Sequence, residues 1–249
     1  MTRSSGNPVK IQTCEVFTEA LMPLLTAPSV IYFDVNETML DMSQVKSAIA
    51  DALGNNEDLV PVWFSTLLHH SLVDCASGGF HNFTEIGAAA LVMVAHSQGI
   101  QLSMEEATNK ITGPMTSIPP HADVKESLVK LAEKGFVLVA LSNSSQHGLE
   151  QQLANAGIAP YFNSVMSVEH LRIYKPYPQV YEAALKKMKI SAQQGLMVAA
   201  HGWDVTGAKA VGMQTAFVER PGKMMYPLGR EPDISVKDLN ELTATLLAM

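Results

Sequence analysis

The chain has 249 residues, 47% of them hydrophobic and 16% charged, which is enough to bury a substantial core. Its 17 basic and 24 acidic residues give a formal net charge of −7 at pH 7, and its basic residues do not cluster as nucleic-acid binding requires. No apolar run approaches the roughly 18 residues that span a bilayer, and the N-terminus lacks the apolar core of a secretory signal. We therefore expect a cytoplasmic protein with neither nucleic acid nor membrane as a partner.

The first part of the chain contains one strand with helices behind it. Residues 1–27 form an N-terminal extension in which 16–25 has the pattern of a short amphipathic helix. An apolar, β-favouring run from Val30 to Phe33 predicts a buried strand that ends at Asp34. Ser43 is the expected N-cap of a helix through Leu53. Three further segments, 59–73, 84–96 and 103–111, have helical spacing, so 48–119 is predicted to be an inserted helical cap.

Strands and helices then alternate to the end of the chain. A helix from Asp123 stops at Gly135. The expected strands are 136–141, 164–166, 196–200 and 213–218, and the expected helices end near 156 or span 178–188, 205–211 and 236–248. Repeated strand–helix units predict a parallel sheet with helices on both faces. The fold class is therefore α/β: a doubly wound, Rossmann-like core made of 28–47 and 120–249, carrying the cap.

Polar residues follow the predicted strands where each strand ends. Asp34 follows the first, Ser142 and Asn143 follow the second, and His201 and Asp204 follow a later one, while Lys175 precedes a helix. Ligands of open α/β sheets bind at the carboxyl edge of the strands, so these side chains are candidates for one site. Capping or loop roles are the alternative for Asp34, Ser142 and Asn143. The alternative for Lys175 is a solvated helix-entry position, and the alternative for His201 is a structural role.

In their order, these four motifs resemble those of the haloacid dehalogenase superfamily: a nucleophilic aspartate, a Ser or Thr, a lysine and one or more acids. The match extends from about residue 30 onward and includes a helical cap after the first motif. The resemblance implies that Asp34 is a nucleophile, and the next question is which bond it attacks.

Asn36 argues against the phosphatases of that superfamily. They usually carry a second aspartate two positions after the nucleophile as a general acid, and Asn36 cannot donate a catalytic proton. The fourth motif offers one acid, Asp204, which is a poor set of ligands for Mg²⁺. Halide leaves as a stable anion, so its displacement requires neither a general acid nor a metal ion. A Mg²⁺-dependent phosphatase and a non-catalytic relative stay open as alternatives.

The remaining details look like the type II 2-haloacid dehalogenases, which implies a metal-free and cofactor-free hydrolase for (S)-2-haloalkanoic acids, and a homodimer. The resemblance rests on Ser142-Asn143, on Lys175-Pro176 with Tyr181, and on Gly202 to Ala208. It implies that Asp34 forms an ester with inversion of the halogen-bearing carbon. It also implies that Lys175, held by Asp204, keeps the free Asp34 carboxylate ionised. Thr38 and Ser142 would orient carboxylates, and the other substrate-site residues would be Asn36, Asn143, Tyr181, Trp203 and Phe64.

Two departures from the common pattern bear on the chemistry. Within Val62-Trp63-Phe64-Ser65, Phe64 stands where family members typically carry a halide-polarising arginine. Glu37 and His201 stand where the commoner pattern has Gly and Asn. A carboxylate that orients an imidazole makes a competent general base. The hypothesis is that His201, backed by Glu37, activates the water that hydrolyses the Asp34 ester.

Overall fold

A six-stranded parallel sheet forms the centre of the molecule in the computed structural model, which describes residues 26–249. The predicted helix at 16–25 lies outside these residues. The sheet has the order β3-β2-β1-β4-β5-β6. Its strands are β1 (Val30–Phe33), β2 (Val137–Ser142), β3 (Ser164–Ser167), β4 (Gly195–Ala199), β5 (Gln214–Val218) and β6 (Ile234–Val236). The predicted parallel α/β sheet is thus confirmed.

β1 occupies the middle of this sheet. Phe33 lies opposite Ala140 of β2 and Val198 of β4, and all four β1 residues are buried. A parallel strand covered on both faces needs an uninterrupted apolar sequence, which β1 has. The strand order reverses between β1 and β4, so the residue that follows β1 lies at the topological switch point.

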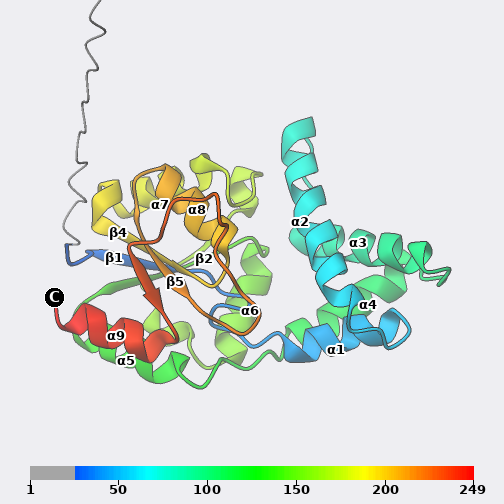
Figure 1. Ribbon diagram of the computed structural model, residues 1–249, viewed down its shortest axis with the longest axis horizontal. Helices are drawn as coiled ribbons and strands as arrows, with labels where there is room; N and C mark the ends of the chain where they lie inside the picture. The colour runs from blue at the N-terminus through cyan, green and yellow to red at the C-terminus, as the bar shows by residue number, and fades with distance from the viewer. Residues whose placement is uncertain (1–25) are drawn as a thin grey trace, which may run out of the picture.

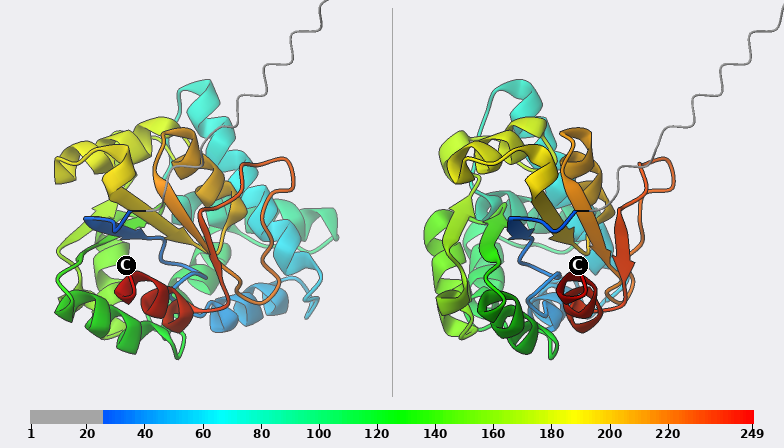
Figure 2. Two further views of the ribbon diagram at one scale, coloured as in Figure 1. Left: turned by 60° about the vertical axis from the view of Figure 1, so that its left-hand side comes forward. Right: turned by 90° about the vertical axis from the view of Figure 1, so that its left-hand side faces the viewer.

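Helices cover both faces of the sheet. α7 (Pro178–Met188) and α8 (Gly202–Ala210) lie on one face, while α5 (Val124–Glu133) and α9 (Leu239–Leu247) lie on the other (Figure 1). The rotated views in Figure 2 show the same two layers. α6 (Gln146–Asn155) packs against β3, and three 3₁₀ turns, η1 (Ala159–Tyr161), η2 (Glu169–Leu171) and η3 (Ala192–Gln194), complete the connections. This is the doubly wound arrangement that the sequence predicts.

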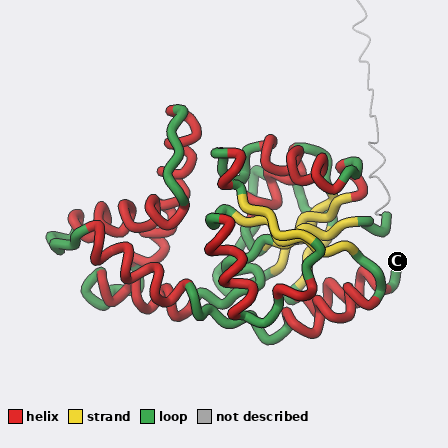
Figure 3. Tube along the Cα trace, turned by 180° about the vertical axis from the view of Figure 1, so that it is seen from behind, coloured by secondary structure: helices red, strands yellow, loops and turns green. Residues whose placement is uncertain are grey.

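Four helices between β1 and α5 pack on one another beside the sheet (Figures 1 and 3). They are α1 (Ser43–Ala52), α2 (Leu59–Ser77), α3 (Phe83–Ser97) and α4 (Met104–Met115). α3 and α4 begin with reciprocal caps, Asn82 with Glu85 and Ser103 with Glu106. The expected cap boundary after residue 47 falls inside α1, so where a cap domain begins stays a prediction. Within residues 26–249, no helix is long and apolar enough to cross a membrane.

Three local expectations were wrong. Ser43 is the first residue of α1 rather than its cap, and its backbone N–H donates to Asp41 Oδ1 at 3.0 Å. Val236 is the last residue of the edge strand β6, which at three residues is too short for a recognisable period, and the predicted helix from 236 begins only at Leu239 as α9. α8 begins at Gly202 rather than near 205, which places Trp203 and Asp204 in the first turn of the helix that follows β4 in the chain.

Candidate active site

Asp34 lies at the carboxyl end of β1, almost completely buried, and both of its carboxylate oxygens accept hydrogen bonds. Its backbone N–H continues the sheet by donating to Val198 O at 3.0 Å. Oδ1 accepts from Lys175 Nζ at 2.8 Å, and Oδ2 accepts from Thr38 Oγ1 at 2.7 Å and pairs with His201 Nδ1 at 3.0 Å. Burial alone would raise the pKa of this carboxyl, but the Lys175 ammonium and the bond from His201 hold that pKa well below its usual range. Asp34 is therefore an ionised, fixed carboxylate.

Lys175 uses its ammonium protons on three buried acceptors. Besides Asp34, its Nζ donates to Asp204 Oδ2 at 2.6 Å and to the Leu141 carbonyl at 3.0 Å. Burial would lower its pKa, but the two carboxylates raise it, so the lysine stays charged. Burial raises the pKa of Asp204, which shares this one ammonium with Asp34, while Tyr181 donates its hydroxyl to Asp204 Oδ1 at 2.5 Å.

His201 bridges two carboxylates. Nδ1 faces Asp34, and Nε2 lies 2.9 Å from Glu37 Oε2, so both ring nitrogens are engaged. Burial would lower the pKa of the imidazole, but the hydrogen bonds to Asp34 and Glu37 raise it above its ordinary value. Burial would likewise raise the pKa of Glu37, whose hydrogen bond from His201 and pairing with Lys223 hold it well below its usual range. The arrangement is that of an imidazolium between two carboxylates.

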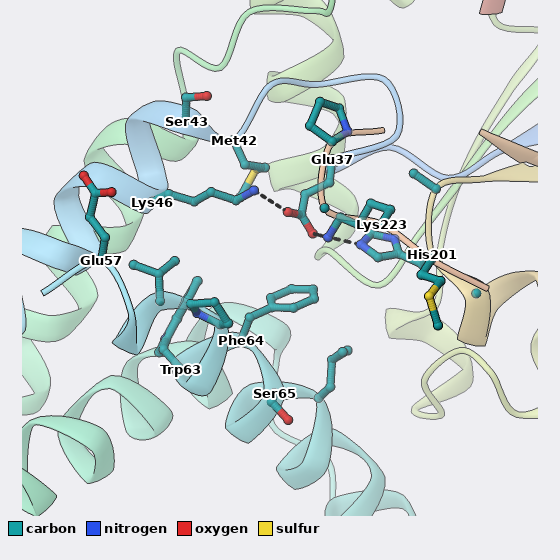
Figure 4. A pocket seen from close by; sticks show the side chains of 18 of the residues that line it. Glu37, Met42, Ser43, Lys46, Glu57, Trp63, Phe64, Ser65, His201 and Lys223 are labelled. Carbon is teal, nitrogen blue, oxygen red and sulfur yellow. Dashed lines mark hydrogen bonds and ion pairs between the residues drawn. The ribbon is translucent and has the colours of Figure 1, made fainter. Parts of the chain in front are cut away.

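Glu37 reaches His201 from an unusual backbone position. Its φ of 64° lies in the left-handed region, where a side chain costs roughly 1 kcal/mol. Two lysines that no sequence motif marks also hold it. Lys46 Nζ lies 2.7 Å from Oε1, and Lys223 Nζ lies 2.5 Å from Oε2 (Figure 4).

A pocket of about 770 Å³ opens beside this cluster. Charged groups line one side, with Glu37, Lys46, His201 and Lys223 among them. α2 supplies an apolar side made of Val60, Trp63, Phe64 and Leu68. The rings form a row: Phe64 stacks on His201 at 5.8 Å between centroids, and His201 stacks on Trp203 at 5.0 Å. An ionised carboxylate, an imidazole and an amphipathic pocket can support nucleophilic displacement on a small organic acid.

A comparison with protein families gives this arrangement a context. Residues 31–218 match the family model for haloacid dehalogenase-like hydrolases. The chain belongs to this family.

Individual relatives of this haloacid dehalogenase-like hydrolase carry consistent names. It is 30% identical to haloacetate dehalogenase H-2 of Moraxella sp. (strain B) over 83% of this chain and 92% of that protein. It is 27% identical to (S)-2-haloacid dehalogenase 2 of Pseudomonas sp. (strain CBS-3), over 85% of this chain and 93% of that protein. Its fold matches the L-2-haloacid dehalogenase of Xanthobacter autotrophicus, solved with chloropropionic acid covalently bound, with a TM-score of 0.80 and 23% identity over 89% and 99% of the two chains.

Three of the expected site residues form a second polar cluster in this hydrolase. Asn143 Oδ1 accepts the Lys175 backbone N–H at 2.9 Å, and Asn36 Nδ2 donates to Ser144 Oγ at 3.1 Å. Ser142 bonds Ser144 rather than Asp34. Within residues 26–249, Asn36 Oδ1 and Asn143 Nδ2 are buried without a hydrogen-bond partner. Buried polar groups normally have partners, so these two atoms lack hydrogen bonds that such groups usually make.

The sequence reasoning missed Ser144, Lys46 and Lys223. Ser144 had a signal, since it continues the polar run after β2. Lys223 had none: it lies between β5 and β6, in a stretch that carries no motif. That loop packs closely against the start of α8, since a Cβ on Gly202 would lie 2.8 Å from Tyr226 N and 2.9 Å from Met224 O.

The described residues contain one free thiol and no cluster of metal-binding side chains. Among residues 26–249, no group of three or more His, Cys, Asp or Glu side chains is arranged to hold a metal ion. Cys75 is a half-buried free thiol whose Sγ lies 3.4 Å from the Tyr174 backbone nitrogen. Cys14 lies outside the described residues.

Proposed function

We propose that this enzyme hydrolyses the carbon–halogen bond of short 2-haloalkanoic acids through a covalent ester on Asp34. The observation that carries the proposal is the ionised Asp34 carboxylate, fixed by Lys175, Thr38 and His201 at the sheet edge. The names of the relatives agree with this substrate class.

In the first step, an Asp34 oxygen attacks the halogen-bearing carbon while the carbon–halogen bonding electrons leave with the halide. Oδ1 is the better placed oxygen, because among the described residues it accepts only from Lys175, whereas Oδ2 accepts from two groups. The departing halide needs no proton. Attack opposite the halogen inverts the carbon, and the (S) enantiomer is the expected substrate.

In the second step, water hydrolyses the ester. Esterification removes the negative charge from Asp34, which weakens its hold on His201, and the imidazolium loses one proton to solvent. Neutral His201 then accepts a proton from water as the hydroxyl adds to the Asp34 carboxyl carbon. The imidazolium protonates the departing alkoxide, and the restored Asp34 carboxyl returns its proton to His201. Haloacid and water thus give hydroxy acid, halide and one proton.

The remaining side chains have supporting roles in this proposal. Asn36 and Asn143 would use their open polar atoms on the substrate, with Ser142 holding Ser144 beside them. Trp203 and Phe64 would line the halide side of the pocket. Tyr181 would hold Asp204 and, through it, Lys175. Helices α1–α4, which supply Phe64, would be the cap over the core.

A halide-release assay tests the reaction. Purified enzyme should release halide from chloro-, bromo- and iodoacetate and from one enantiomer of 2-chloropropionate, with EDTA present. Release of phosphate from phosphate esters only with Mg²⁺, and no halide, would instead favour the phosphatase alternative. Failure on every haloacid with Asp34 intact would indicate a non-catalytic relative.

The second step has its own test in His201→Ala. This variant should still be alkylated but should hydrolyse the ester at least a hundred-fold more slowly, as expected for the loss of general base catalysis. Mass spectrometry should then find the mass of a carboxyethyl group added to the Asp34 peptide after incubation with 2-bromopropionate. Full turnover by His201→Ala would exclude His201 as the base.

A further inference from the structure

Glu37 pairs with more positive charge than one carboxylate can balance. His201, Lys223 and Lys46 all lie within 2.9 Å of its two oxygens, and Lys223 shares Oε2 with His201. Among the described residues, Glu37 is the only carboxylate with which either lysine forms an ion pair. The lysines therefore compete with the imidazolium for the same negative charge (Figure 4).

This competition bears on the proton that His201 must lose before it can act as a base. A Glu–His pair with no other partners stabilises the protonated imidazole, since the carboxylate charge is directed at it alone. In the ester intermediate Asp34 is neutral, so Glu37 is the remaining carboxylate hydrogen-bonded to His201. Cations on Glu37 reduce the stabilisation that it gives to the imidazolium.

We propose that Lys223 and Lys46 are positioning residues that, by pairing with Glu37, allow His201 to release its proton once Asp34 is esterified. The inference rests on the proposed function. Lys223 has the larger effect, because its side chain is 19% exposed and shares the oxygen that His201 uses. Lys46 is 48% exposed and bonds the other oxygen, so solvent screens it more strongly.

The other charged or titratable groups around His201 and Glu37 either bind other partners or line the pocket without pairing with Glu37. Lys175 pairs with Asp34 and Asp204, and the His201 carbonyl faces the first turn of α8. His121 Nε2 contacts the Glu37 carbonyl at 3.2 Å, and Arg220 binds the Thr38 carbonyl at 3.0 Å. Glu57 lines the outer pocket. Among residues 26–249, this leaves Lys46 and Lys223 as the cations besides His201 in contact with the Glu37 carboxylate.

A direct contact with the carboxylate of the substrate is the competing role for these lysines, since both line the pocket. The two roles act on different steps. A substrate contact would change the KM and the rate of halide release. Adjustment of His201 would change the pH dependence of ester hydrolysis.

Single-turnover rapid quench with 2-bromopropionate separates the steps, because bromide release reports alkylation and lactate formation reports hydrolysis. In Lys223→Met, the pH below which lactate formation slows should rise by about one unit, since removal of the cation strengthens the hold of Glu37 on the proton. Bromide release should change much less. Lys46→Met should show a smaller shift in the same direction, and Lys223→Arg should restore the wild-type profile.

Lys110→Met is the matched control, because Lys110 also pairs with a carboxylate, Asp51, at a solvent-exposed position away from the pocket. Circular dichroism melting establishes that each variant is folded. Slower bromide release with an unchanged hydrolysis profile in Lys223→Met would overturn the proposal in favour of substrate binding, and an unshifted profile in both steps would also overturn it. Absence of bromide release in the wild type would instead defeat the proposed function itself.

Discussion

At the scale of single residues, the site depends on one buried ammonium held between two carboxylates. Lys175, Asp34 and Asp204 are all enclosed, and breaking a buried pair costs far more than its formation gains, because an uncompensated charge remains. The Tyr181 hydroxyl donates a hydrogen bond to Oδ1 of Asp204, the carboxylate oxygen that Lys175 does not bind. The orientation of Asp34, the proposed nucleophile, thus depends on a phenol that does not touch it.

Tyr181→Phe should therefore reduce both stability and activity. We expect a loss of about 2 kcal/mol in the free energy of unfolding, since a buried charged acceptor loses its donor, and a fall in kcat of about ten-fold as Lys175 shifts toward Asp204. Urea unfolding and halide release measure the two effects.

Tyr32→Phe is the matched control for that variant. The Tyr32 hydroxyl donates to the Ala184 carbonyl at 3.1 Å inside the core and does not contact the site. Its removal should cost about 1 kcal/mol with kcat unchanged. Equal losses of kcat in the two variants would mean that Tyr181 acts through general stability alone.

At the scale of elements, the close approach of α8 to the start of α7 fixes where Lys175 lies. A Cβ on Gly207 would fall 2.6 Å from Pro176 Cβ and 2.7 Å from the Tyr181 hydroxyl oxygen. Real Cβ atoms do not approach so closely, so only glycine allows α8 to lie against the Lys175-Pro176 segment. Gly207 is therefore needed for the close packing of α8 on the Lys175-Pro176 segment, not for a turn.

Gly207→Ala should accordingly lower the free energy of unfolding by about 1–3 kcal/mol and slow halide release, because Pro176 and its neighbour Lys175 must move. Gly113→Ala is the comparison, because Gly113 lies within α4 and a Cβ added there would meet no packed neighbour within 4 Å. The gain from replacing a helical glycine is opposed by Pro114, which disfavours a helical conformation for a preceding residue with a Cβ, so the net change should stay within about 0.5 kcal/mol. Thermal melts compare the two, and a neutral Gly207→Ala would show that the helices separate easily.

The sheet and its polar edge were predictable because both depend on local patterns. Buried parallel strands have continuous apolar sequences, and Asp34, Ser142 and His201 each lie at the end of such a run. Lys46 and Lys223 were not predictable, since a lysine in a helix or a loop carries no local mark of the carboxylate it will meet after folding. The strand β6 was not predicted for a related reason, since three residues at a sheet edge give too short a pattern to recognise.

At the scale of the whole molecule, folding concentrates buried charge from distant segments at one point, and the stability of the fold therefore depends on pH. The pKa of Glu37 lies below its ordinary value in the folded protein. A depressed carboxyl pKa contributes stability above the unfolded pKa of about 4.3, and the contribution is lost as the pH falls below that value. Stability is also lost at higher pH through His201: its raised pKa contributes stability that is fully present below the unfolded pKa of about 6.5 and is lost as the pH rises through the folded pKa.

Glu37→Gln should be less stable than the wild type at pH 7, and the difference should shrink as the pH falls below about 4. Urea unfolding across this range measures it. Glu57→Gln is the control, because Glu57 is exposed and, within residues 26–249, is not part of an ion pair; its difference from wild type should stay within about 0.5 kcal/mol. A constant difference for Glu37→Gln at all pH values would contradict the ionic role.

The expected homodimer stays a prediction at this scale. Sedimentation at several protein concentrations measures it.

The left-handed backbone at Glu37 has a consequence for how such a site could arise. Glycine, the residue of the commoner pattern at this position, adopts a φ of 64° without cost, and here a glutamate accepts the same conformation. The loop therefore needs no new backbone path to exchange one residue for the other. The pair that we propose to activate water could thus be acquired or lost by side-chain replacement at two positions, 37 and 201, with the rest of the scaffold left in place.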